Sequence, residues 1–268
     1  MNDAETNVDY SVLDKPEILM FLFHPRQEGG FMPRQSSGLD VSIPVGTDVS
    51  IGACFHMAGK TDPNILFFHG NGEIVADYEE LGPVYNQLNI NFLPVDYRGY
   101  GRSEGKPTVT AMMKDCHTIL LFVKGWLEQH GYTGPLIAMG RSLGSASALE
   151  LASTRGDDVE ALIIESGFAQ AAPLLNLLGI DTRRLGFKEE NGFRNIDKIR
   201  TFRKPTLIIH AEFDHIIPFS DGQALFETSA AENKKILQIP GANHNDIFAR
   251  GLSAYLKAIQ NMIEALPA

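Results

Sequence analysis

A serine, an aspartate and a histidine follow one another along this chain where each could take part in nucleophilic catalysis. Ser142 lies in Gly140-Arg-Ser-Leu-Gly144, between an apolar run and a segment of small, helix-forming residues. Asp214 and His244 come later, each in a loop that follows a predicted strand. A serine hydroxyl is a weak nucleophile and needs a base beside it, and the base needs an acid that fixes its tautomer. The order serine, acid, base supplies all three parts.

The glycines two positions before and two positions after Ser142 have a steric reason. A nucleophilic serine stands on a strained turn between a strand and a helix, so that its Oγ is clear of the backbone. That strand and helix pass each other closely, and only small residues permit the approach. Residues 136–139 are typical of a strand buried on both faces, and 146–152 favour a helix. The motif alone can arise by chance among 25 glycines, but this context favours a nucleophile elbow.

Apolar runs alternate with helical patterns from residue 64 to the end of the chain. Strands are predicted at 65–68, 90–95, 136–139, 161–164, 205–211 and 235–239, after an antiparallel hairpin at 39–45 and 49–56. Such alternation implies an α/β fold with a mainly parallel sheet of about eight strands and helices on both faces. Sites in these sheets form beyond the carboxyl ends of the strands, which is where Ser142, Asp214 and His244 all fall.

Five stretches of the chain resemble motifs of the α/β-hydrolase family. They are His69-Gly-Asn-Gly-Glu73, Asp96-Tyr-Arg-Gly-Tyr-Gly-Arg-Ser103, Gly140-Arg-Ser-Leu-Gly144, Asp214-His-Ile-Ile-Pro218 and Asn243-His-Asn-Asp246. The resemblance covers residues 38–265 and is greatest to short-capped serine hydrolases, which include protein depalmitoylases. It implies the α/β-hydrolase fold, an acyl-enzyme on Ser142 and cleavage of a carboxylic ester or thioester. One departure is Ala211, where relatives often have glycine.

The resemblance also assigns roles to individual residues. Asp214 is the expected acid and His244 the expected base, and the backbone N–H groups of Asn71 and Leu143 form the expected oxyanion hole. Glu165 is a rival for the acid, because some members of the family carry it one strand earlier. Neither a metal ion nor an organic cofactor is implied.

Seven other histidines compete with His244 for the role of base. His69 fits the oxyanion turn, and His210 and His215 lie beside the acid, where a base is not expected. The remaining four are predicted away from the catalytic edge, in the N-terminal arm, a strand or helices: His24, His56, His117 and His130. Two other functions stay open, namely amide or peptide cleavage by the same triad and a non-catalytic binding protein that keeps the fold.

The chain is divided into an irregular arm at 1–37 and a hydrolase domain at 38–268, with a short cap insertion at 168–203. The first half of the cap carries leucines that could line an acyl pocket or simply pack onto the domain. Its second half, 181–204, has eight basic and four acidic side chains. Such a run is more often a solvated face, but it could attract an anionic substrate.

Composition limits the partners and the cellular compartment that we expect for this protein. A formal charge of −10 argues against nucleic acid as a partner. Two cysteines cannot form a disulfide framework or a four-ligand zinc site. The start of the chain lacks a basic signal-peptide region, and its longest apolar run, 18–23, is too short to span a bilayer. We therefore expect a cytoplasmic protein without stable membrane insertion, acting on a small-molecule or acylated substrate.

Overall fold

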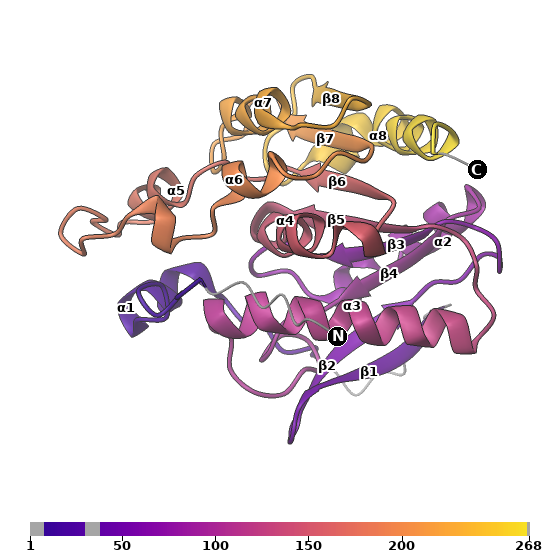
Figure 1. Ribbon diagram of the computed structural model, residues 1–268, viewed down its shortest axis with the longest axis horizontal. Helices are drawn as coiled ribbons and strands as arrows, with labels where there is room; N and C mark the ends of the chain where they lie inside the picture. The colour runs from indigo at the N-terminus through magenta and orange to yellow at the C-terminus, as the bar shows by residue number, and fades with distance from the viewer. Residues whose placement is uncertain (1–7, 30–37, 267–268) are drawn as a thin grey trace.

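An eight-stranded sheet runs through the computed structural model, which describes residues 8–29 and 38–266 (Figure 1). The strand order is β1-β2-β4-β3-β5-β6-β7-β8. β2 pairs antiparallel with β1 and β4, and the other neighbours are parallel, so the predicted mainly parallel sheet is confirmed. The strands are β1 (Leu39–Gly46), β2 (Val49–Phe55), β3 (Asn64–Phe68), β4 (Asn91–Val95), β5 (Leu136–Arg141), β6 (Ala161–Glu165), β7 (Thr206–Ala211) and β8 (Lys234–Ile239).

Helices cover both faces of the sheet, and this explains why its central strands are apolar throughout. Successive residues of one strand enter different cores: Leu66 and Phe68 face one side, Ile65 and Phe67 the other. The first core includes residues of α3 (Val109–Gln129), α4 (Ser145–Thr154) and α7 (Phe219–Thr228). The second includes residues of α2 (Leu81–Gln87) and α8 (Ile247–Glu264). A strand buried on both faces has no polar side, which is the pattern that the sequence presents.

The segment between β3 and β4 has helical spacing, with Ile74, Tyr78, Leu81 and Tyr85 four or three residues apart, but it does not form a single helix. A short 3-10 turn, Val75–Tyr78, is followed by α2. Pro83 lies in the first turn of α2, where no backbone N–H donor is needed. An α-helix that continued from the residues before it would need that donor, so α2 starts as a separate helix. A Cβ on Gly82 would approach the His56 ring to 2.2 Å, so α2 packs directly on the end of β2.

The N-terminal arm is not irregular throughout, which corrects the sequence-based expectation for part of it. Residues 16–22 form the helix α1 (Pro16–Leu22), with Pro16 at the start, where a fixed φ suits a first helical turn. Ile18 and Leu22 are buried in the main core. Pro16 therefore begins a helix instead of breaking one. The rest of the arm that was expected to be irregular, 1–7 and 30–37, lies outside the described residues.

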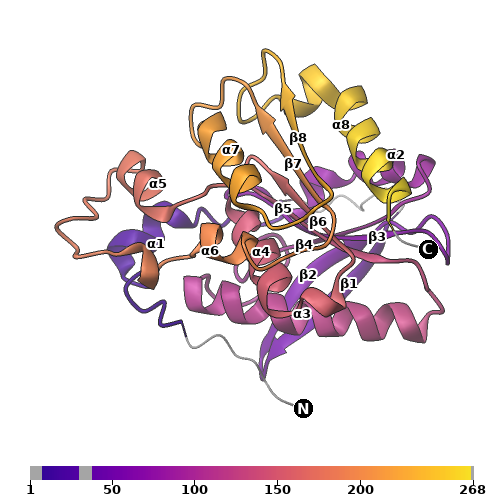
Figure 2. The same ribbon diagram turned by 45° about the horizontal axis from the view of Figure 1, so that its top comes forward.

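The cap insertion contains two short helices, α5 (Ala171–Leu177) and α6 (Asn195–Ile199). In both views α1 lies beside α5 at one end of the sheet (Figures 1 and 2). Leu175 and Ile180 are buried in the main core, whereas Leu177 is 59% exposed. Leu175 and Ile180 therefore pack the cap onto the domain, whereas Leu177 is open to solvent.

The basic half of the cap is mostly paired. Ion pairs join Lys188 to Glu190, Arg194 and Arg200 to Asp197, Lys198 to Glu150, and Lys204 to Glu160. Three exposed arginines make no ion pair with another described residue: Arg183, Arg184 and Arg203.

Among the described residues, no helix combines the length and hydropathy needed to cross a bilayer.

Candidate active site

Ser142 occupies a strained turn at the end of β5. Its φ is 50°, in the left-handed region that residues other than glycine rarely adopt. A Cβ on Gly144 would lie 2.1 Å from the Phe68 carbonyl oxygen, and one on Gly140 would lie 2.2 Å from the Gly144 oxygen. Both positions therefore require glycine, for the close approach of strand and helix that the motif predicts. The turn leads through Ser142–Gly144 into α4.

Asp214 and His244 reach Ser142 from two neighbouring loops at the same edge of the sheet. Asp214 lies between β7 and α7, and His244 lies between β8 and α8. The Ser142 Oγ and His244 Nε2 atoms are 3.1 Å apart, and His244 Nδ1 is 2.7 Å from Asp214 Oδ2. All three side chains are buried or nearly so. The structure thus brings together the three residues that the sequence order indicated.

The other oxygen of Asp214 is held by its own loop. Asp214 Oδ1 accepts hydrogen bonds from the backbone N–H groups of Ile216, at 3.0 Å, and Ile217, at 2.8 Å. Burial disfavours the ionised carboxylate, but the hydrogen bonds from His244 and from these two amides hold the pKa of Asp214 below its usual value. A charged Asp214 can therefore fix the Nδ1–H tautomer of His244, which leaves Nε2 free to accept a proton.

Glu165, the rival acid, lies in a different set of contacts. It accepts a hydrogen bond from Arg141 Nη1 at 2.6 Å and one from the Tyr255 hydroxyl at 2.7 Å. Its side chain is completely buried. Among the described residues, Glu165 makes no hydrogen bond to a histidine, so Asp214 is the carboxylate placed against His244.

Asn71 lies in the turn after β3, beside the elbow, because Gly144 packs against the carbonyls of Phe68 and His69. No described residue accepts a hydrogen bond from the Asn71 backbone N–H. Its side chain, by contrast, is fully engaged. Asn71 Oδ1 accepts from the His24 backbone N–H at 2.8 Å and from the Tyr100 hydroxyl at 2.7 Å.

His24 was predicted to lie away from the catalytic edge, and that prediction is wrong. Its ring Nδ1 lies 2.8 Å from Asn71 Nδ2. The same segment of the arm binds the turn again through Arg26, whose Nε donates to the Gly72 carbonyl at 3.2 Å. No local pattern in the sequence indicates these contacts, because they join segments 46 and 47 residues apart.

His69 is buried behind the turn and is held by Asp96. Its Nε2 lies 3.1 Å from Asp96 Oδ1, and its Nδ1 lies 2.8 Å from the Gly70 carbonyl. Burial lowers the pKa of His69, but Asp96 more than offsets this and raises it above its usual value. Asp96 also accepts from the Val75 N–H at 2.9 Å, so it holds both His69 and the start of the segment that follows the turn after β3.

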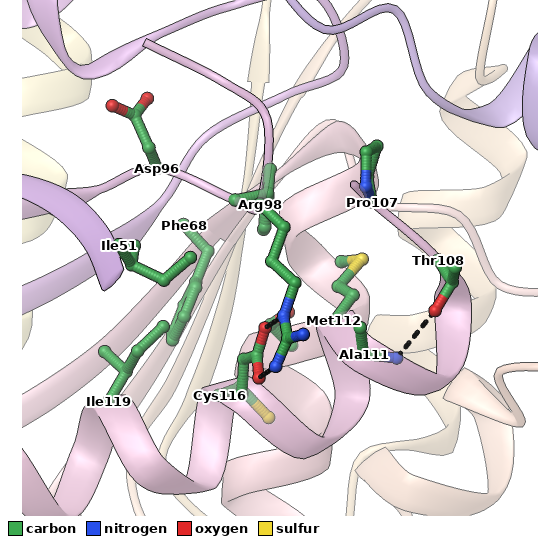
Figure 3. A pocket seen from close by; sticks show the side chains of 13 residues that line it. Ile51, Phe68, Asp96, Arg98, Pro107, Thr108, Ala111, Met112, Cys116 and Ile119 are labelled. Atoms are coloured by element: carbon green, nitrogen blue, oxygen red, sulfur yellow. Dashed lines mark hydrogen bonds and ion pairs between the residues drawn. The ribbon is translucent and has the colours of Figure 1, made fainter. Parts of the chain in front are cut away.

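A small cavity lies apart from this site, under the start of α3 (Figure 3). Arg98 and Asp115 pair across it, with nitrogen–oxygen distances of 2.6 and 2.8 Å. The Thr108 side chain accepts from the Ala111 N–H there and caps the start of α3. None of Ser142, Asp214 and His244 lines this cavity, so it is separate from the candidate active site. Arg98 has a structural role.

Within the described residues, no cluster of histidine, cysteine or acidic side chains could hold a metal ion.

Sequence reasoning missed two charged residues of the site, Glu73 and Arg141. Arg141 precedes the nucleophile directly and is 6% exposed. A charged residue that closes a buried apolar strand needs partners nearby, and this was the available signal. Its Nε donates to Glu73 Oε1 at 2.8 Å.

Comparison with known proteins agrees with this description. Residues 59–184 match the Hydrolase_4 family, described as serine aminopeptidase S33. The chain is 29% identical over 217 residues to the α/β hydrolase domain-containing protein WAV2 of Arabidopsis thaliana, covering 75% of this chain and 70% of that protein. It is 32% identical over 207 residues to the human α/β hydrolase domain-containing protein 17B, covering 74% of this chain. The alignment spans 65% of that relative, slightly less than two thirds of its length.

A similar solved structure is the Pyrococcus furiosus esterase Pf2001. It superimposes with a TM-score of 0.70 at 17% identity, covering 91% of this chain and 99% of that one. At that identity the likeness concerns the fold alone. The chain has the α/β-hydrolase fold, and the family match and the relatives support a hydrolase of the α/β-hydrolase family.

Proposed function

We propose that the protein is a serine hydrolase that cleaves a carboxylic ester or thioester through an acyl-enzyme on Ser142. The observation that carries the proposal is the continuous hydrogen-bond chain from Ser142 Oγ through His244 to Asp214. The positive φ of Ser142 supports it further, because strained residues of this kind are concentrated at active sites. A non-catalytic role would not need an intact chain of this geometry.

The reaction follows from the positions of these groups. His244 Nε2 takes the proton of Ser142 Oγ as that oxygen forms a bond to the substrate carbonyl carbon, and the carbonyl electron pair moves to oxygen. The backbone N–H groups of Asn71 and Leu143 are the proposed donors to this oxyanion, each worth about 10²- to 10³-fold in rate. The tetrahedral species expels the alcohol or thiol, which takes the proton from His244. Water then attacks the acyl-enzyme by the same route in reverse.

A short cap favours an open site that admits a substrate with a bulky leaving group, such as an acylated protein whose cysteine thiol leaves. The resemblance to the short-capped depalmitoylase branch supports the thioester part of the proposal. Amide cleavage is the second candidate, because the matching family is described as a serine aminopeptidase. We also propose a reducing compartment such as the cytoplasm, since the chain has only two cysteines and cannot build a disulfide framework from them.

The test uses a fluorophosphonate probe and a panel of chromogenic substrates. We expect one covalent adduct, on Ser142, that is absent in Ser142→Ala. We also expect hydrolysis of p-nitrophenyl esters and of an acyl thioester of matched chain length, with little release from aminoacyl p-nitroanilides. Folded wild-type protein that forms no adduct would contradict the enzyme. An adduct with faster release from the anilides would favour the aminopeptidase instead.

A further inference from the structure

Arg141 links the three segments that the proposed reaction requires. It is the last residue of β5 and is bonded directly to Ser142, so its main chain belongs to the nucleophile's turn. Its Nη2 donates to the backbone carbonyl of His244 at 2.8 Å. Its Nε donates to Glu73 Oε1 at 2.8 Å, and its Nη1 donates to Glu165 Oε1 at 2.6 Å. Each nitrogen of the guanidinium therefore has a different partner.

The contact with Glu73 extends to the proposed oxyanion hole. The second oxygen, Glu73 Oε2, accepts from the Gly70 N–H at 2.6 Å and from the Tyr78 hydroxyl at 2.6 Å. Gly70 is the residue before Asn71. The carboxylate thus holds the oxyanion turn on one side while Arg141 holds the carboxylate on the other.

Glu165 supports the guanidinium from the opposite side of β5. It is the register partner of Arg141 in the parallel pair of β5 and β6. Tyr255 of α8 donates to its other oxygen at 2.7 Å. The Arg141 side chain is 7% exposed and the Glu165 side chain is fully buried, so both positions are constrained by packing as well as by charge.

The charges of Arg141 and Glu73 stabilise each other. Burial opposes ionisation of Glu73, but Arg141 outweighs it and holds the pKa of Glu73 at about 2. Burial likewise disfavours a charged Arg141, and the two carboxylates keep its pKa well above the usual value. A buried cation held between one buried and one partly exposed carboxylate needs all of these directional contacts to offset the cost of burying its charge.

We propose, on the basis of the function proposed above, that Arg141 is a positioning residue for catalysis. It fixes the His244 loop and the oxyanion turn relative to Ser142, and it does so through the planar fork of its guanidinium. Lysine retains the charge but has a single nitrogen, which cannot occupy three fixed donor positions. Substitution by lysine therefore separates the role of geometry from the role of charge.

The experiment compares Arg141→Lys with Arg98→Lys. Arg98 also pairs through its guanidinium, but both of its bonds go to one carboxylate, that of Asp115, and among the described residues it does not touch the His244 loop or Glu73. We measure kcat and KM for p-nitrophenyl acetate from pH 5 to 9. We also measure both the rate and the final extent of Ser142 labelling by a fluorophosphonate. Circular dichroism and thermal melts report on folding.

We expect Arg141→Lys to lower kcat about 10²-fold, because a misplacement of about 1 Å can cost that much. KM should stay within about threefold, since ground-state binding is not altered. Labelling should slow in proportion to kcat and still reach completion. Arg98→Lys should label and turn over as the wild type does.

Several results would overturn the proposal while leaving the proposed function standing. One is a lower melting temperature with unchanged kcat and labelling rate, which is a purely structural role. A second is a pH profile of kcat with an unchanged plateau and a displaced acid limb, because that result means that Arg141 acts only through its charge. A third is an equal loss in both lysine variants. If Arg141→Lys does not fold, Glu165→Gln takes its place. That change should lower kcat about tenfold, and an unchanged kcat would overturn the proposal. A wild type that is not labelled at all would instead contradict the serine hydrolase.

Discussion

Replacing Asp214 by asparagine tests the assignment of the acid, and the structure shows why the loss should be large. An asparagine at 214 has the same shape, but one oxygen becomes an NH₂ group. If the NH₂ faces His244, it donates to Nδ1, and the proton of the imidazole must then sit on Nε2. In that tautomer Nε2 cannot take the proton of Ser142, which is 3.1 Å away.

The other orientation of the amide is no better. Its oxygen can accept from His244 Nδ1, but the NH₂ group then faces the backbone N–H groups of Ile216 and Ile217. Those groups lie 3.0 and 2.8 Å from the present carboxylate oxygen. The two backbone N–H donors would then face the NH₂ donor, with no acceptor for any of them. Neither orientation stabilises the charged imidazole. We expect kcat to fall about 10⁴-fold, equivalent to about 5 kcal/mol of transition-state stabilisation.

The assay is kcat for a p-nitrophenyl ester, with Glu165→Gln as the matched control. Both changes convert a buried carboxylate into an amide, but of these two residues Asp214 alone makes a hydrogen bond to His244. Glu165→Gln should cost about tenfold, through Arg141 alone. A mild effect of Asp214→Asn together with a severe effect of Glu165→Gln would refute the reasoning and make Glu165 the acid.

Two further predictions concern pH and salt. Because Glu73 has a pKa of about 2 in the folded protein and an ordinary value of 4.5, it stabilises the fold above pH 4.5 and loses that effect as pH falls toward 2. In urea melts from pH 6 to 3, unfolding free energy should therefore fall less steeply for Glu73→Gln than for wild type; parallel curves would contradict this. The exposed Arg183 and Arg184 should favour an anionic ester, with kcat/KM falling as ionic strength rises. The double change to glutamate should abolish that dependence, and a neutral ester with equal salt dependence would argue against it.

The parts of the fold that the sequence predicts are those whose cause is local. Strands buried on both faces appear as unbroken apolar runs, and the elbow has glycines that only a close strand–helix approach requires. Ser142, Asp214 and His244 each follow a predicted strand, and the carboxyl ends of parallel strands lie at one edge of the sheet. Topology therefore assembled the candidate site from a linear pattern.

The parts that could not be predicted depend on partners distant in the sequence. Arg141 donates to Glu73 and to His244, which are 68 and 103 residues away. Nothing near Arg141 indicates those partners. Likewise, the residues around Pro16 do not show whether it interrupts regular structure or begins a helix. Burial of Ile18 and Leu22 in the main core decided the outcome.

The contact of His24 with Asn71 has a consequence for the order of events during synthesis. Residues 24–28 leave the ribosome early, yet they bind Asn71, Tyr100 and the Gly101 main chain, the last two more than 70 residues later. The arm must therefore wait, undocked, until β3 and β4 have emerged and paired. Domains fold largely as units during translation, so this turn becomes ordered on both sides only after the sheet has formed. Nascent chains arrested before residue 100 would then have residues 24–28 open to protease, and protection would appear only in chains long enough for the sheet to form outside the ribosome.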